Sequence, residues 1–145
     1  MAAESRGVAM ARHPEWEQRL SDLVEGWMDA SYAWNRHDCG HFAAACTEAV
    51  AGERVWPAEL GAYRSERGLL RALKRCGWAG LDEMVTALLG PPIAPLAAHR
   101  GDILFDGRAL GVMGPAGPMA MTHEGLSLIA RDSIVAAWPV GRAHG

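Results

Sequence analysis

The sequence predicts an α+β fold in a single domain, residues 1–145, with N-terminal helices packed on a small C-terminal antiparallel sheet. Apolar residues repeat at helical spacing through residues 14–90. Short apolar runs between glycine-rich turns follow in residues 101–140. The Gly90-Pro91-Pro92 step separates the two patterns, because proline cannot continue a helix. Helices that precede the strands, rather than alternate with them, indicate the α+β class.

Four helices are expected in the first part of the chain, because each apolar stripe is bounded by residues that start or stop helices. Pro14 suits the first turn of the first helix, where its missing N–H costs nothing. Gly52 suits the end of the second helix, and the Ser65 hydroxyl can cap the start of the third. The expected helices cover residues 14–30, 38–52, 65–77 and 81–90.

Five short strands are expected in the second part. Asp102 lies at the start of the first strand and is expected to be a turn or cap carboxylate. Gly111, inside the second strand, indicates the close approach of another backbone, which we expect to be the alanine-rich second helix. Residues 114–118, rich in glycine and proline, are expected to form a turn. The expected strands cover residues 101–107, 110–113, 119–122, 126–129 and 134–138.

Charge and cysteine content exclude several classes of protein. The formal charge of −3, without a basic run, gives no reason to expect nucleic acid as a partner. Residues 1–13 are expected to be flexible, and residues 1–11 lack the apolar stretch of a signal peptide, so neither a secretion signal nor a membrane span is expected. Three cysteines without a Cys-x-x-Cys pair, and no clustered histidines, predict no disulfide framework, no metal site and no cofactor.

Six tryptophans are many for a chain of 145 residues. We interpret them as anchors of a small core, because an indole ring buries a large apolar area. The alternative is an aromatic groove that contacts a ligand or a protein partner, since aromatic residues are enriched at interfaces.

Cys39 is the candidate nucleophile, because it is expected in the first turn of the second helix. Unpaired backbone N–H groups and the positive end of the helix dipole favour a thiolate there. Asp38 is the expected N-cap and would orient this end of the helix. The alternative interpretation of Cys39 is a small apolar core residue, since it continues the stripe through Phe42 and Cys46.

The order of these motifs resembles that of the NlpC-type peptidases, papain-like cysteine hydrolases that cut peptide bonds in bacterial cell walls. Asp-Cys-Gly-His-Phe at residues 38–42 is similar to their Asp-Cys-Ser-Gly-Phe motif at three positions. Arg-Gly-Asp-Ile-Leu at residues 100–104 is similar to their Gly-Asp-Leu strand. Leu-Gly-Val-Met at residues 110–113 is similar to their His-Val-Gly-Ile-Tyr strand from its second position onward. The resemblance implies a papain-like fold.

The chain resembles more closely a divergent branch of this superfamily, encoded among phage and prophage tail genes and of unassigned function. That branch shares the Asp-Cys-x-x-Phe helix, a Tyr-Arg-Ser step like residues 63–65, the Arg-Gly-Asp strand and an Ala-Trp-x-Val ending like residues 137–140. The resemblance covers most of residues 30–140, in order.

The expected catalytic base is missing from its family position. The resemblance places the family's histidine at Ala109 and its second polar residue near Met121, and neither side chain can accept a proton. His123 is the possible replacement base, because alternation along a strand would turn it to the same face as Met121. Its alternative interpretation is a turn histidine beside Glu124.

The resemblance implies a component of a phage-type tail tip or baseplate, a virion structural protein with a degraded peptidase site. It would be assembled in the host cytoplasm into the virion tail, with other tail or baseplate proteins and peptidoglycan peptide as partners. The alternative is an active cysteine peptidase or amidase that cleaves peptidoglycan peptides during cell-wall penetration, with Cys39 as nucleophile. A third possibility is a bacterial binding module for cell-wall peptides.

Overall fold

The structure is a computed structural model and describes residues 11–143. Of the segment 1–13, which was expected to be flexible, residues 1–10 lie outside the described part of the chain. His13 is tied to the second helix of the expected set, because its backbone N–H donates to the carbonyl of Val50 at 2.8 Å.

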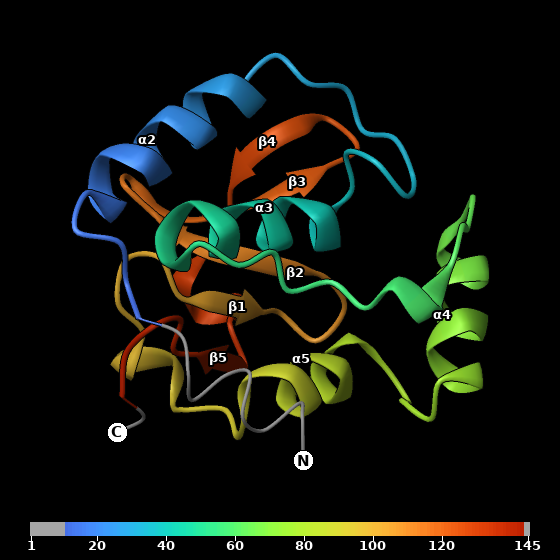
Figure 1. The fold of residues 1–145 in the computed structure, drawn as a ribbon. Helices are drawn as coiled ribbons and strands as arrows, with labels where there is room; N and C mark the ends of the chain where they lie inside the picture. Colours follow the sequence, from blue (N-terminus) through green and yellow to red (C-terminus); the bar gives the residue numbers. More distant parts are fainter. Residues whose placement is uncertain (1–10, 144–145) are drawn as a thin grey trace.

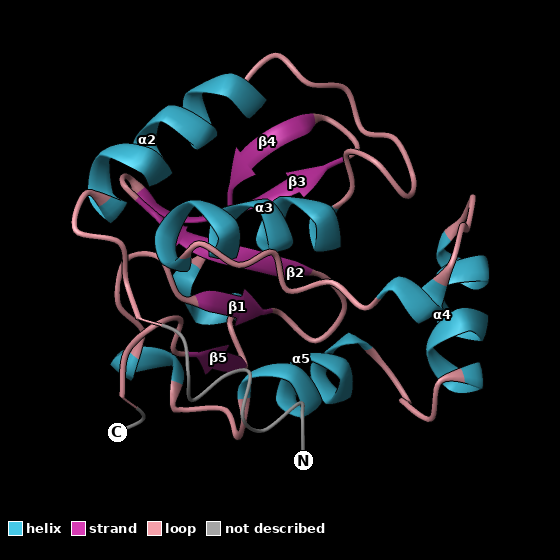
Figure 2. Cartoon of the chain, in the orientation of Figure 1, coloured by secondary structure: helices cyan, strands magenta, loops and turns pink. Residues whose placement is uncertain are grey.

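The α-helices of the described chain all precede the sheet (Figure 1 and Figure 2). Capping residues at the helix ends determine where these helices begin and stop. The backbone of Gly52 takes a φ of 80° immediately after α3, and the hydroxyl of Ser65 accepts the N–H of Gly68 at the start of α4. The helices are α2 (Trp16–Trp27), α3 (Cys39–Ala51), α4 (Glu66–Arg75) and α5 (Leu81–Leu89), with short 3₁₀ turns η1 (Ala58–Leu60), η2 (Pro95–Ala97) and η3 (Arg131–Ser133).

The five strands form one antiparallel sheet in the order β4-β3-β2-β1-β5. The first four follow one another as a meander, and β5 returns to pair with β1, where Ile103 lies opposite Trp138. The strands are β1 (Ile103–Phe105), β2 (Leu110–Gly114), β3 (Gly117–Thr122), β4 (Gly125–Leu128) and β5 (Ala136–Trp138). The predicted α+β class, with helices followed by an antiparallel sheet, is confirmed in these general terms.

The turn between β2 and β3 is shorter than expected. Gly114 pairs with Gly117, so only two residues connect the strands, whereas a turn over residues 114–118 was expected. Gly117 has a φ of +130°, which an L side chain rarely adopts. A glycine-rich pattern therefore predicted the place of the turn but overestimated its length.

The helix that begins with Cys39 is buried against the sheet, as predicted. α3 lies across β2 and β3, and α2 packs beside α3 and also contacts β2 (Figure 1). The side chains of Phe42, Cys46 and Val50 are fully buried in this layer. Alanines between them keep the helix thin, so that it approaches the sheet closely.

Gly111 does not face α3, which corrects the expectation from the sequence. A Cβ atom added to Gly111 would lie 2.6 Å from the backbone oxygen of Met119 and 3.4 Å from the side chain of Ile129. Ile129 packs on the smaller apolar cluster that contains Leu104 and Met113. The close approach that requires glycine is therefore to the neighbouring strand β3.

Tryptophans anchor the core, as the preferred interpretation predicted. Trp138 is fully buried, and its indole N–H donates to the hydroxyl of Thr86 at 3.1 Å. The others are partly buried and pack around the main core cluster. Trp34 also lines the cleft described below, so the aromatic-groove interpretation applies to that residue as well.

Asp102 joins both ends of the described chain to the sheet. Its carboxylate is fully buried and accepts hydrogen bonds from the guanidinium groups of Arg12, at 3.0 Å, and Arg142. It also accepts the backbone N–H of His99 at 2.8 Å and that of Val140 at 3.1 Å. The expected turn carboxylate is thus also the partner of two arginines.

Candidate functional site

Cys39 is the first residue of α3, and the backbone around it is fixed by Asp38. Asp38 is extended, with φ −105° and ψ 178°, and its carboxylate accepts the N–H of His41 at 2.8 Å. It is the N-cap that the sequence predicts. The cap sets the direction in which the Cys39 side chain leaves the helix.

The buried carboxylate of Asp38 also holds three other groups. It accepts the N–H of Asn35 at 2.8 Å, the hydroxyl of Tyr63 at 2.6 Å and a hydrogen bond from Nδ1 of His41 at 2.8 Å. Burial opposes ionisation of Asp38, but the hydrogen bonds from His41 and Tyr63 outweigh it and keep the pKa below its usual value. His41 is therefore bound to Asp38, and its ring lies tilted against that of Trp56 with 4.4 Å between the ring centroids.

The Cys39 thiol is protonated at neutral pH. Burial is the main cause that raises its pKa to about 11, and the negative charges of Asp38 and Asp106 raise it further. Backbone N–H groups of Leu110 and Gly40 act in the opposite direction but are outweighed. The position at a helix start thus does not by itself activate this thiol, because its side chain is only 7% exposed.

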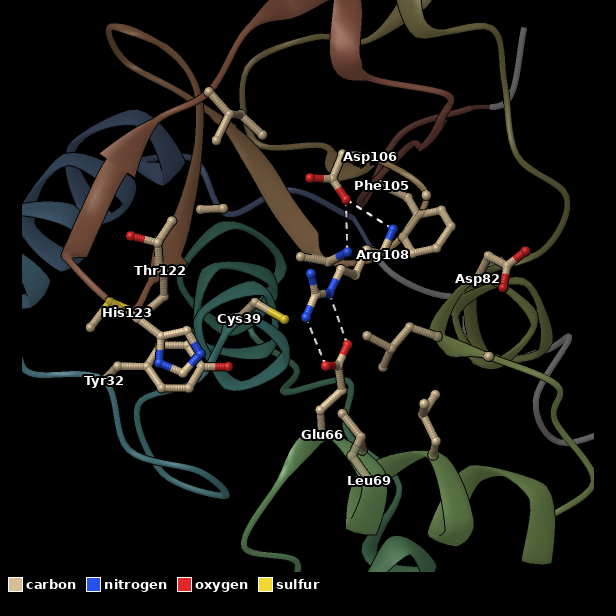
Figure 3. A pocket seen from close by; sticks show the side chains of 18 of the residues that line it. Tyr32, Cys39, Glu66, Leu69, Asp82, Phe105, Asp106, Arg108, Thr122 and His123 are labelled. Atoms are coloured by element: carbon tan, nitrogen blue, oxygen red, sulfur yellow. Dashed lines mark hydrogen bonds and ion pairs between the residues drawn. The ribbon is translucent and has the colours of Figure 1, made fainter.

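The thiol faces a cleft of about 620 Å³, within the usual size range of small-molecule sites. The loop between β1 and β2 and the turn between β3 and β4 form one side of the cleft, and α4 and the start of α5 form the other. In Figure 3 the rings of Tyr32 and His123 lie on one side of the Cys39 sulfur, and the ion pair of Glu66 with Arg108 lies on the other.

Ala109 and Met121, the two positions that the resemblance assigns to polar residues, both line this cleft. Ala109 directly precedes β2, and its N–H donates to the carboxylate of Asp106 at 2.7 Å. Its methyl group packs against the core cluster that contains Cys39. This side of the cleft carries no imidazole, and the carboxylate of Asp106, which also lines it, accepts the backbone N–H groups of Arg108 and Ala109.

His123 lies in the turn between β3 and β4, and not within a strand. Its ring stacks on Tyr32, with 4.2 Å between ring centroids, and lies 6.0 Å from the ring of Trp34. The imidazole lines the same cleft as Cys39, but within residues 11–143 no hydrogen bond joins the thiol to an imidazole. The turn interpretation of His123 therefore describes its backbone, while its side chain remains a candidate base.

Tyr32 and Tyr63 belong to this site and were given no role from the sequence. The backbone N–H of Cys39 faces the hydroxyl of Tyr32, and burial raises the pKa of that hydroxyl, so it stays protonated. Burial and the bond to Asp38 likewise raise the pKa of Tyr63. Tyr63 lies in the Tyr-Arg-Ser step that the sequence singles out, whereas Tyr32 carries no such signal.

In the described part of the chain, no group of three or more His, Cys, Asp and Glu residues is arranged to hold a metal ion. Its cysteines, Cys39, Cys46 and Cys76, are all free thiols. Among the described helices, none has the length and apolar character needed to cross a bilayer.

Fold and site together define an α+β protein with a capped, buried cysteine at the base of a cleft. The chain belongs to a family described as a domain of unknown function, DUF6950, whose model matches residues 11–140. No curated protein and no solved structure matches the chain.

Proposed function

We propose that this chain is a component of a phage-type tail tip or baseplate, built on the papain-like arrangement of NlpC-type peptidases, and that its catalytic site is degraded. The supporting observation is a protonated thiol to which, within residues 11–143, no imidazole is hydrogen-bonded. Burial raises the pKa of the Cys39 thiol to about 11, and the resemblance to NlpC-type peptidases places their histidine at Ala109. General-base assistance contributes about 10²–10⁴-fold to catalysis, so its loss removes most of the activity.

A second candidate is an active cysteine peptidase or amidase, and the place of His123 favours it. The imidazole lines the same cleft as Cys39, so a movement of the β3–β4 turn would bring a base to the thiol. Such a movement would have to break the stacking of His123 on Tyr32. We rank this candidate second because that stacking holds the ring in place.

Hydrolysis of purified peptidoglycan separates the two candidates. We expect wild type, Cys39→Ser and His123→Ala to release no soluble peptide above buffer, because a protonated thiol is a weak nucleophile. Cleavage by the wild type, lost in both variants, would establish the active peptidase. The far-ultraviolet circular dichroism of each variant should match the wild type, which excludes unfolding as a cause.

A partner surface is expected on the face of the sheet that α3 does not cover. A small apolar depression there is lined by Leu96, Leu104 and Met113. Leu96 is 99% exposed and Val135 is 60% exposed, so apolar side chains remain uncovered on the free chain. Contact with other tail or baseplate proteins would bury them.

Sedimentation velocity tests this assembly. We expect the purified chain to co-sediment with the tail proteins encoded beside it, and Leu96→Glu to weaken that complex by at least about tenfold, since a buried unpaired charge is costly. Met28→Glu, a change at a 57% exposed site directly after α2 and away from both the depression and the cleft, is the matched control. A chain that stays separate from every neighbouring tail protein would contradict the tail assignment.

A further inference from the structure

The cleft at Cys39 concentrates negative charge. One guanidinium, that of Arg108, and five carboxylates line it, which leaves a formal charge of −4 with histidine counted as neutral. The entire chain, counted in the same way, carries −3. The acidic residues come from four separate parts of the fold, namely α4, α5, the β1–β2 loop and the β3–β4 turn: Glu66, Asp82, Glu83, Asp106 and Glu124.

Two of these carboxylates, those of Asp106 and Glu83, accept hydrogen bonds from neutral backbone N–H groups. Asp106 accepts the N–H groups of Arg108 and Ala109, and Glu83 accepts the N–H of Ala79 at 2.8 Å. A neutral donor leaves the carboxylate charge in place. The potential in the cleft is therefore negative and favours the entry of cations.

Glu66 already binds a cation across the cleft. Arg108, from the β1–β2 loop, donates through Nε at 2.9 Å and through a terminal nitrogen at 2.8 Å to the two carboxylate oxygens of Glu66, at the start of α4 (Figure 3). The Arg108 side chain is 79% exposed and that of Glu66 is 43% exposed. Exposed ion pairs contribute little to stability, so the guanidinium can be exchanged for another cation.

An aromatic wall adjoins this ion pair. The rings of Tyr32 and Trp34 meet edge to face at 5.1 Å, and both residues line the cleft with Glu66. Aromatic faces attract ammonium and guanidinium groups, and the attraction increases where water is excluded. A carboxylate that binds a fork of N–H donors, beside aromatic rings and within a cavity, is a subsite for an organic cation.

We propose that the cleft binds a peptide through a basic side chain, lysine or arginine, which replaces Arg108 on Glu66. Arg108 is then a built-in competitor: its guanidinium occupies the cation subsite in the free chain and swings into solvent when the peptide enters. The inference rests on the proposed function in treating the cleft as a peptide site, but it does not require catalysis by Cys39.

The test is the binding of short fluorescent peptides, acetylated and amidated, that contain one arginine, measured by anisotropy in a Cys39→Ser background. We expect Arg108→Met to bind several-fold tighter than the parent protein and Glu66→Gln to bind at least tenfold weaker. Replacing the peptide arginine by citrulline, which has the same shape without the charge, should abolish binding. Arg54→Met is the matched control, because the Arg54–Glu48 pair is also exposed and lies outside the cleft.

Equal affinity for the arginine and citrulline peptides, or weaker binding by Arg108→Met, would overturn the proposal. The place of binding is read separately, with Cys39 restored, from slower reaction of its thiol with a neutral disulfide when the peptide is present. Failure here leaves the peptidoglycan result untouched, since no hydrolysis is measured. Cleavage of peptidoglycan would in turn leave the cation preference intact.

Discussion

Replacing Ala109 by histidine is expected to raise the rate at which Cys39 attacks a neutral disulfide at pH 7 by about 30–60-fold. Ala109 lines the same cleft as the thiol, and the next residue, Leu110, directs its backbone N–H at the sulfur. An imidazole at this position would meet the thiol from a side of the cleft that carries no histidine. Dithiodipyridine is a suitable reagent, because its release is followed by absorbance.

The magnitude follows from the thiolate fraction. With a pKa of about 11, roughly one Cys39 thiol in 10⁴ is ionised at pH 7. A neighbouring imidazolium that restores a pKa of about 8 would raise that fraction by about 10³. A thiolate whose pKa is lower by three units is also less nucleophilic, by about 15–30-fold. The net increase in the reaction rate is therefore about 30–60-fold.

The pH dependence gives a second signature. Since burial raises the pKa of the Cys39 thiol in the folded chain, the wild-type rate should rise about tenfold per pH unit from about pH 7 to about pH 10 without a plateau. The same shift means that the folded state holds the proton more tightly than the unfolded chain does. Its stabilising contribution is complete below pH 9.0 and is lost as the pH rises towards about 11.

Two controls make the result specific to position 109. The measurements use a Cys76→Ser background, because Cys76 is partly exposed whereas Cys46 is fully buried. Ala109→Gln adds similar bulk without a base and should react at the wild-type rate. If the histidine and glutamine variants react alike, position 109 is out of reach of the thiol, and the correspondence implied by the resemblance to NlpC-type peptidases is wrong.

Local signals predicted the elements of this fold well. The Ser65 cap, the Gly52 terminus and the Gly90-Pro91-Pro92 break each act within a few residues, so the helix ends could be placed from the sequence. The first helix begins at Trp16 rather than at Pro14, which is a normal uncertainty for helix ends. Helix ends that depend only on residues close in the sequence could therefore be predicted.

Contacts between distant segments could not be predicted in the same way. The Tyr63 hydroxyl reaches Asp38 from 25 residues away, and no periodicity encodes that bond. The burial of Cys39 depends on β2 packing over its helix, so the sequence indicated a favourable dipole but not the larger cost of desolvation. The structure therefore places Cys39, Ala109 and His123 on one cleft, while the cost of burying the thiol could not be read from the sequence.

Asp102→Asn is expected to lower the free energy of unfolding by about 3–5 kcal/mol, the usual cost of breaking a buried ion pair from one side. Asp102 is fully buried, and the side chains of Arg12 and Arg142 that it binds are only 13% and 19% exposed. Asparagine keeps the shape but leaves two guanidinium groups without a counter-charge. Its amide nitrogen would also face donors rather than acceptors, because every recorded partner of this carboxylate is an N–H group.

Urea unfolding followed by tryptophan fluorescence measures the loss, with Glu48→Gln as the matched control. Glu48 pairs with Arg54 in solvent, and its loss should change the stability by less than about 0.5 kcal/mol. Adding Arg142→Gln to Asp102→Asn should recover part of the stability, because only the Arg12 guanidinium then remains unpaired. If Asp102→Asn is too unstable to fold, Arg142→Gln alone still gives a graded loss. Stability of Asp102→Asn within about 0.5 kcal/mol of the wild type would show that the carboxylate does not hold the two chain ends to the sheet.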